Sequence, residues 1–130
     1  MKTIDDLNKE LYFASQNKNW EMTKYLVEKG ATDLNRALSW ASYKNNLEMV
    51  KYLVEKGATE DLNLALYWAA YNNNLEMVIY LVKKGAKDLN KALFNASKNN
   101  NLEMVNFIKF VIYVRSNNIT IINNHTLLIS

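Results

Sequence analysis

The stretch DLNRALSWASYKNNLEMVKYLVEKGATE, residues 33–60, is one unit of a pattern that fills most of this chain. Its opening triplet Asp-Leu-Asn begins at residues 6, 33, 61 and 88, so the units follow one another at spacings of 27, 28 and 27 residues. A period of roughly 20 to 50 residues is typical of a solenoid, in which one unit is too small to bury its own apolar face. The sequence therefore predicts a stack of repeats.

Apolar residues within the unit 33–60 follow helical spacing. A first helix has its stripe at Leu34, Ala37, Leu38 and Ala41, and a second helix has its stripe at Leu47, Val50, Leu53 and Val54. Asn45 and Asn46 lie between them, because asparagine suits a tight turn and the cap of a following helix. Asp33 or Thr32 is expected to cap the first helix. Gly57 supplies the left-handed residue that ends the second.

The period predicts a single all-α domain of about four helix-turn-helix repeats, residues 6–32, 33–60, 61–87 and 88–110, with a capping tail at 111–130. The tail is apolar and rich in β-branched residues. It could extend the last helix, fold back as a hairpin cap or stay poorly ordered. We expect an extended helix and a loosely packed tail that covers the last repeat. If exposed, the tail would be a site of self-association.

Composition excludes several kinds of chemistry. The chain has 130 residues, 49% of them hydrophobic, a net charge of +3 and no cysteine, which removes disulfides and thiolate zinc sites. The only histidine, His125, has no partner at metal-ligand spacing, and no phosphate-binding loop or nucleophile motif is present. We expect no enzyme activity, metal or cofactor. Because no secretory signal or membrane-length apolar run is seen, an intracellular, cytoplasmic location is expected.

The repeat resembles an ankyrin repeat. NNLEMV at residues 45–50 and LVEKGA at 53–58 are similar to the family's G-H-L-E-x-V and L-L-x-x-G-A strings. Residues 36–42 keep the Leu and the Ala of T-P-L-H-x-A-A but lose its Thr, Pro and His. The resemblance covers residues 6 to about 108 and implies an ankyrin-like helical-repeat solenoid that binds a protein partner. Because the ankyrin period is ~33 residues, the β-turn finger should be stunted and the binding surface should shift onto the first helices.

Positions that vary from repeat to repeat are the candidates for specificity. On the first helix these positions include Arg36, and they place Trp40, Tyr43, Trp68 and Tyr71 in an aromatic ladder across two repeats. Such residues dominate interface hot spots, so the ladder is expected to line a concave face and anchor a partner. Alternatively, the tryptophans only fill space between neighbouring helices. If the tyrosines face solvent, their replacement by alanine should leave the melting temperature almost unchanged.

The resemblance also implies partner contacts just after the Ala-Ala pair of each first helix. In this sequence those positions are Gln16 and Asn17, Tyr43 and Lys44, Tyr71 and Asn72, and Lys98 and Asn99. Together with Arg36, Trp40 and Trp68 they form the predicted partner-binding set.

Repeat one reads as an end cap, because Glu10 and Thr23 introduce polarity where the inner repeats have Ala and Val. Trp20 is expected to tuck over the exposed end of the stack. Two other functions remain open. The array could bind nucleic acid through Lys24, Lys44, Lys51 and the aromatic residues, although a nucleic-acid binder more often concentrates its Arg and Lys residues on one face. It could also be a structural protein that associates through its tail.

Overall fold

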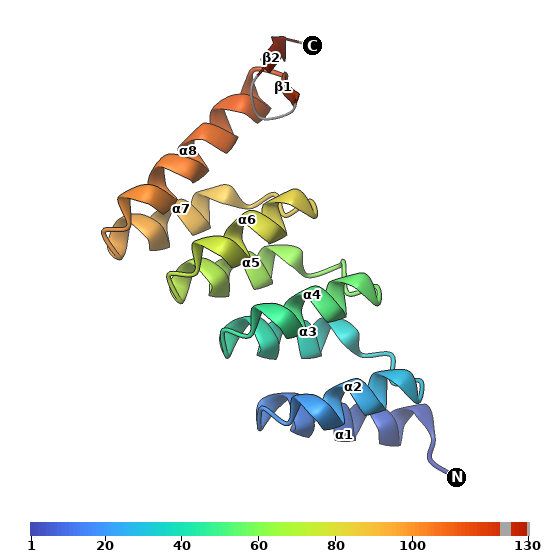
Figure 1. Ribbon diagram of the computed structural model, residues 1–130. Helices are drawn as coiled ribbons and strands as arrows, with labels where there is room; N and C mark the ends of the chain where they lie inside the picture. The colour runs from blue at the N-terminus through green and yellow to red at the C-terminus, as the bar shows by residue number, and fades with distance from the viewer. Residues whose placement is uncertain (123–125, 130) are drawn as a thin grey trace.

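The computed structural model describes residues 1–122 and 126–129, and within them the chain forms eight helices in four pairs. The pairs are α1 (Ile4–Gln16) and α2 (Trp20–Glu28), α3 (Leu34–Tyr43) and α4 (Leu47–Glu55), α5 (Leu62–Tyr71) and α6 (Leu75–Lys83), and α7 (Leu89–Lys98) and α8 (Leu102–Ser116). They stack in chain order, so that the first and last pairs lie at opposite ends of the array (Figure 1). The prediction of an all-α repeat solenoid is confirmed.

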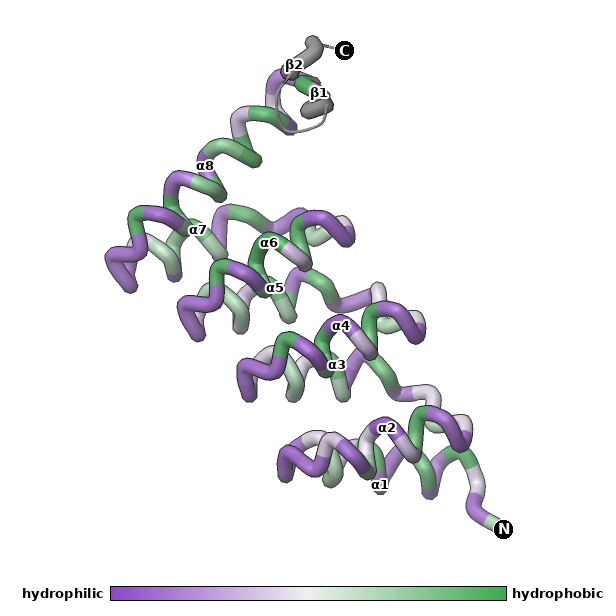
Figure 2. The backbone as a smooth tube through the Cα atoms, viewed as in Figure 1, coloured by the Kyte–Doolittle hydropathy of each residue, from purple (hydrophilic) through white to green (hydrophobic). Residues whose placement is uncertain are grey.

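The turn inside repeats two, three and four is made by asparagine, as the sequence predicts, whereas Lys18 takes this position in repeat one. In repeat two Asn45 has a φ of 64°, and the Oδ1 atom of Asn46 accepts the backbone N–H of Met49 at 3.0 Å. Equivalent caps are made by Asn19, Asn74 and Asn101. At the far end of the second helix Gly57 has a φ of 114°, a conformation that other residues adopt only with strain. Hydrophilic residues therefore gather at the turns along one edge (Figure 2).

One apolar core runs through all four repeats. The predicted stripe residues of α3 and α4 are buried, except that the first residue of each, Leu34 and Leu47, is half-buried. A column of small residues, Ala37, Ala65 and Ala92, is fully buried between neighbouring first helices. The backbones of α1, α3, α5 and α7 accordingly contact one another in turn, whereas each second helix mainly contacts its own first helix. The first helices thus lie on the tighter, inner side of the array.

The asparagine of the Asp-Leu-Asn triplet joins one repeat to the next. The Oδ1 atom of Asn8 accepts backbone N–H groups of Thr32 at 2.8 Å and Asp33 at 3.0 Å. Asn63 does the same for Lys87 and Asp88. The prediction of a cap from Asp33 or Thr32 was wrong, since Asp33 makes no side-chain cap bond and the hydroxyl of Thr32 accepts from Asn8. The preceding repeat instead fixes the start of the helix through the N–H groups of Thr32 and Asp33.

Asn63→Ala should lower the free energy of unfolding by about 1–2 kcal/mol, because it leaves two backbone donors in the next loop without their acceptor. Asn90 holds the same position in repeat four, where no repeat follows, and within the described residues its side chain makes no hydrogen bond. Asn90→Ala is therefore the matched control, and urea unfolding of the two variants is the measurement. Equal losses would show that the asparagine acts within its own repeat.

A second set of asparagines links the turns of neighbouring repeats. The Nδ2 atom of Asn74 donates to Oδ1 of Asn45 at 2.8 Å, and Asn101 donates to Asn73 at 2.7 Å. Asn74 and Asn101 are also the caps of their own second helices. The Oδ1 atom of each therefore accepts a backbone N–H of its own helix, while the Nδ2 atom bonds the turn of the preceding repeat. Many of the 20 asparagines therefore have a defined structural role.

A polar contact ties the ends of α2 and α4 together. The hydroxyl of Tyr52 donates to the Glu28 carboxylate at 2.6 Å, and the Lys56 ammonium lies 3.1 Å from the same oxygen. Burial, and then the hydrogen bond to Glu28, raise the pKa of Tyr52 from 10.0 to about 12. In turn the hydrogen bond from Tyr52, followed by Lys56, holds the pKa of Glu28 below its usual value.

Tyr52→Phe should raise the pKa of Glu28 toward its usual value, because it removes the hydroxyl hydrogen bond that contributes most to stabilising the Glu28 carboxylate, while Lys56 stays. An NMR titration of the carboxyl carbon measures it, with Tyr25→Phe, the equivalent exposed tyrosine, as control. Since folding raises the pKa of Tyr52, its contribution to stability is complete below pH 10 and is lost between pH 10 and about 12. An unchanged Glu28 titration would contradict the assignment.

The C-terminal segment extends the last helix, as expected, and then forms a hairpin; that it covers the last repeat stays a prediction. Helix α8 continues through residue 110 to Ser116, and then β1 (Ile119–Ile122) pairs antiparallel with β2 (Thr126–Ile129), with Ile119 opposite Ile129. The guanidinium of Arg115 anchors the extension, since Nη1 donates to the carbonyl of Ala86 at 2.9 Å and Nη2 to that of Val82 at 3.2 Å. His125 lies outside the described residues.

Repeat one differs from the predicted cap in two respects. Glu10 pairs with Lys2 at the open end, as expected of a cap, but Thr23 adds no polar outer surface, because it is buried with its hydroxyl bonded to the carbonyl of Asn19. Trp20, however, packs on the core and lines a hollow with Asn46, Glu48 and Met49 of repeat two. The expectation that it covers the free end is wrong. Its column faces the following repeat.

Candidate functional site

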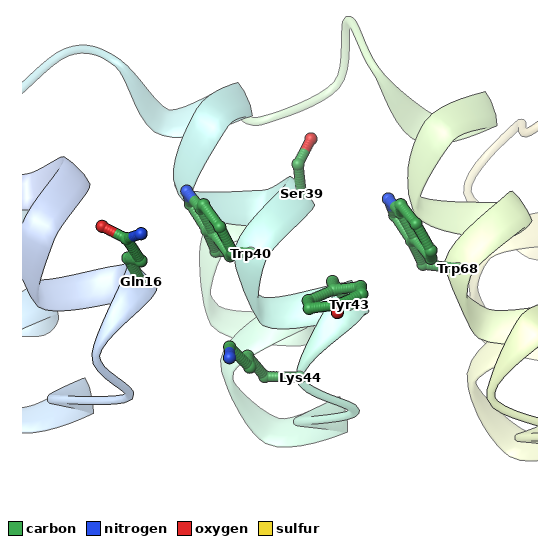
Figure 3. A pocket seen from close by; sticks show the side chains of 6 residues that line it. All are labelled: Gln16, Ser39, Trp40, Tyr43, Lys44 and Trp68. Atoms are coloured by element: carbon green, nitrogen blue, oxygen red, sulfur yellow. The ribbon is translucent and has the colours of Figure 1, made fainter.

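The aromatic residues of the first helices touch one another across three repeats. The rings of Trp40 and Tyr43 have their centroids 6.0 Å apart, and the ring of Tyr43 meets Trp68 of the next repeat edge-on at 4.7 Å and 76°. Trp68 meets Tyr71 at 5.4 Å. Edge-to-face contacts at such distances are favourable. In Figure 3 the ring of Tyr43 lies between the two tryptophans.

Three further aromatic residues extend the ladder, and the sequence prediction did not include them as site residues. Tyr12 contacts Trp40 at 5.9 Å and Phe13 at 5.4 Å, and Tyr67 contacts Trp68 at 5.0 Å. Tyr12 and Tyr67 share a column that also varies between repeats, with Ser39 and Phe94 in it, so the same rule applied one position earlier would have found them.

The ladder is neither wholly core nor wholly surface. Trp40 and Trp68 are half-buried, whereas Tyr43 and Tyr71 are exposed. The tryptophans thus do pack between neighbouring first helices, and they still present part of each ring at the inner side of the array. The exposed fractions of the tyrosines agree with the expectation that they face solvent.

A hollow of about 550 Å³ opens among these side chains. It is lined by Gln16, Ser39, Trp40, Tyr43, Lys44 and Trp68, which come from three successive repeats (Figure 3). Five of the six belong to the predicted partner-binding set. The repeat stacking brings them together, because Gln16 ends α1, the middle four lie on or just after α3, and Trp68 projects from α5.

Positive charge borders the aromatic surface. The Lys44 ammonium lies 5.8 Å from the ring centroid of Trp40 and 5.3 Å from that of Tyr43, and it makes no ion pair within the described residues. Arg36 lies 5.6 Å from the Tyr12 ring, and its Nε atom is 3.6 Å from Asp33. Arg36 lines a neighbouring hollow of about 920 Å³ with residues of α1. The surface therefore offers aromatic area together with a cation that has no acidic partner in the part of the chain described.

Two of the predicted asparagines are engaged inside the array. The Nδ2 atom of Asn72 donates to the carbonyls of Ser42 and Tyr43, both at 3.0 Å. Asn99 donates in the same way to Ala70 at 3.2 Å. These amides donate to carbonyl groups at the C-terminal end of the preceding first helix, so their N–H groups are already hydrogen-bonded within the array.

The remaining predicted residues lie at the two ends of this surface. Asn17 is exposed at the end of α1, and Lys98 is exposed at the end of α7. The ladder stops before repeat four, because Asn95 replaces the tryptophan and is buried, with its amide 3.5 Å from the carbonyl of Tyr67. Lys98 and Asn99 therefore lie outside the hollow.

The described residues hold no cluster of three or more His, Cys, Asp or Glu side chains that could bind a metal ion. No helix among those residues is long and apolar enough to cross a membrane. The features that remain are an aromatic surface, a shallow hollow and the Lys44 ammonium, which makes no ion pair within the described residues.

Fold and surface together define a helical-repeat solenoid whose first helices form an inner face with exposed aromatic side chains. Residues 38–82 match the family described as ankyrin repeats (many copies), so this part of the chain is similar to ankyrin repeats. Ankyrin repeats are generally protein–protein interaction modules and are typically non-catalytic. No curated protein matches the sequence.

Proposed function

We propose that this chain is a non-catalytic protein-binding module that holds its partner across the stacked first helices. The observation that carries the proposal is the ladder of touching rings around the 550 Å³ hollow. Tyrosine and tryptophan bury large areas at low entropy cost, and here the rings already contact one another, which favours a preorganised binding surface.

The chemistry of the hollow suggests the kind of segment that fits. Trp40, Tyr43 and Trp68 would cover an apolar or aromatic side chain of the partner, while Lys44 would meet an acidic group next to it. Gln16 is half-buried at the rim, and its amide makes no hydrogen bond within the described residues, so it can pair with the partner's backbone. A cytoplasmic location is part of the same proposal, in keeping with a chain that has no cysteine.

The surface favours a protein over a nucleic acid as partner. Of the three lysines considered for phosphate contacts, only Lys44 borders the ladder. Lys24 lies on a second helix 3.8 Å from Glu48, and Lys51 lies on the next second helix over Tyr80. Phosphate binding is favoured by cations gathered on one face, whereas these three lysines are divided between the face of the first helices and that of the second helices.

A displayed library of random peptides, selected on the intact chain, tests the proposal. Peptides that bind should quench the fluorescence of the tryptophans, and Tyr43→Ala should weaken them at least about 30-fold, the effect of a hot-spot residue of about 2 kcal/mol. Its stability should change by no more than about 1.5 kcal/mol. Tyr25→Ala is the control, because Tyr25 is similarly exposed but lies on α2.

Two results would count against the proposal. Peptides that bind the Tyr43 and Tyr25 variants equally would move the binding surface away from the ladder. Tight binding of a single-stranded oligonucleotide, with an affinity that falls steeply between about 50 and 200 mM salt, would favour the nucleic-acid alternative.

A further inference from the structure

The outer side of repeat one is an unoccupied copy of a surface that the inner repeats use for stacking. Met22 is 42% exposed, whereas its equivalent in repeat two, Met49, is 2% exposed, and Met77 and Met104 are fully buried. In those repeats the methionine faces the preceding repeat. Tyr25 beside it is also exposed, although the equivalent Tyr52 and Tyr80 pack against the core.

The outer side of repeat four is the matching half. Leu102 is 73% exposed, while the equivalent Leu47 and Leu75 are half-buried against the core. This is the column in which Trp20 lies beside Met49 of the following repeat. Phe94 and Phe110 are exposed on the same repeat. One end of the array thus presents the forward-facing leucine, and the other end presents the methionine of the column that this leucine column adjoins at an internal junction. The two ends lie at opposite extremes of the stack (Figure 1).

The polar groups match as well. At internal junctions the cap asparagine donates back to the turn asparagine of the preceding repeat, as Asn101 does to Asn73. Asn19 is the cap of repeat one and Asn100 is the turn residue of repeat four, and within the described residues neither the Nδ2 atom of Asn19 nor the side chain of Asn100 has a partner. Asn17 likewise holds the position of Asn72 and Asn99, with an unbonded amide.

We infer that copies of this chain associate head to tail, with the repeat-one end of one copy packed on the repeat-four end of the next. Leu102 of one copy covers Met22 of the other, and Phe110 covers Tyr25, because Phe110 holds the position from which Glu28 meets Tyr52 at the first internal junction. Asn19 donates to Asn100 across the junction. The occupant is a second copy because the junction repeats one that the chain already forms internally. A head-to-tail contact of this kind does not close on itself, so it adds further copies at both ends.

Glu10 sets the strength of this association. It occupies the column of Ala37, Ala65 and Ala92, which are fully buried at internal junctions, so docking places its carboxylate in the contact. Lys2 pairs with Glu10 and offsets part of the cost of removing that charge from water. Association is therefore weaker than stacking within the chain, and Glu10→Ala strengthens it by at least about tenfold.

Two variants test the inference, each blocking one end. Met22→Glu and Leu102→Glu place a carboxylate at exposed positions in the first turn of α2 and α8, where negative charge favours the helix. The wild-type chain should show a sedimentation coefficient that rises with concentration. Each variant alone should stay monomeric, and an equimolar mixture should form a 1:1 dimer of twice the mass and nothing larger.

Other outcomes would overturn it. The inference would be overturned if the equimolar mixture of Met22→Glu and Leu102→Glu stayed monomeric. It would also be overturned if the wild-type chain and the Glu10→Ala variant, each measured alone, both stayed monomeric. A Leu102→Glu variant that still associates while Met22→Glu does not would show that two repeat-one ends pair symmetrically. Association that survives both substitutions would place the contact elsewhere, for example in the segment after Ser116. Far-UV circular dichroism confirms that each variant is folded.

Discussion

Ala65→Glu should destabilise the array by at least about 3 kcal/mol, although the same residue is present at the equivalent position of repeat one. Ala65 is fully buried between first helices, whereas Glu10 lies at the open end beside Lys2. A carboxylate at position 65 would be removed from water without a partner. Urea unfolding measures the loss, and Glu10→Ala should change stability by no more than about 0.5 kcal/mol at concentrations where the chain is monomeric.

The pH dependence separates charge from size. Folding would raise the pKa of the introduced carboxyl, so its charge penalty is absent below about pH 4.3, the ordinary value for glutamate, and grows as the pH rises above it. Ala65→Gln introduces nearly the same volume without the charge and should show no such dependence. A penalty that stays constant from pH 4 to 7 in the glutamate variant would mean that steric crowding alone is responsible.

Leu66→Ala should lower the free energy of unfolding by about 2–5 kcal/mol, the usual cost of a cavity left by a buried leucine. Leu66 has no exposed surface and lies in a central repeat, so its contacts contribute to two junctions. Leu64 on the same helix is exposed, and Leu64→Ala is the matched control, with an expected change below about 1 kcal/mol.

Denaturant unfolding followed by circular dichroism compares the two leucine variants. Because stability in a solenoid depends on nearest-neighbour stacking, Leu66→Ala should also lower the slope of the transition if the repeats on either side begin to unfold separately. Equal losses for Leu64→Ala and Leu66→Ala would contradict the assignment of Leu66 to the continuous core.

Local rules were sufficient to predict the helices and their turns. Apolar residues at i, i+3, i+4 and i+7 determine which side of a helix is buried, and Asn46 and Gly57 act on backbone groups only a few residues away. The methionine column was not recognised, because full burial of Met49 requires the preceding repeat, as the 42% exposure of the equivalent Met22 in repeat one shows. To predict that a side chain is buried by a neighbouring repeat, one must know how closely the repeats stack, and the sequence spacing of the repeats does not give that distance.

The same limit applies to the polar residues. The sequence shows that asparagine recurs at positions 8, 35 and 63, but not that the amide reaches about 25 residues ahead to the next loop. Asn72 was predicted from the family resemblance to contact a partner, and its amide holds the end of α3. The aromatic ladder could be predicted because it depends only on helical spacing and on the order of the repeats. Whether the partner contacts the predicted set of residues stays a prediction.

The junctions between repeats are not equally bonded. In repeat one the turn residue is Lys18, whereas repeats two and three have asparagine there. In repeat two, Lys44 holds the position from which the amides of Asn72 and Asn99 donate to the preceding first helix. Among the described residues, the first junction therefore lacks two kinds of amide bond that the later ones have, and it has instead the ion pairs of Glu28 with Lys56 and of Lys24 with Glu48. Because salt screens exposed charges and leaves amide hydrogen bonds largely unaffected, rising ionic strength would weaken the attachment of α1 and α2 more than that of any later pair.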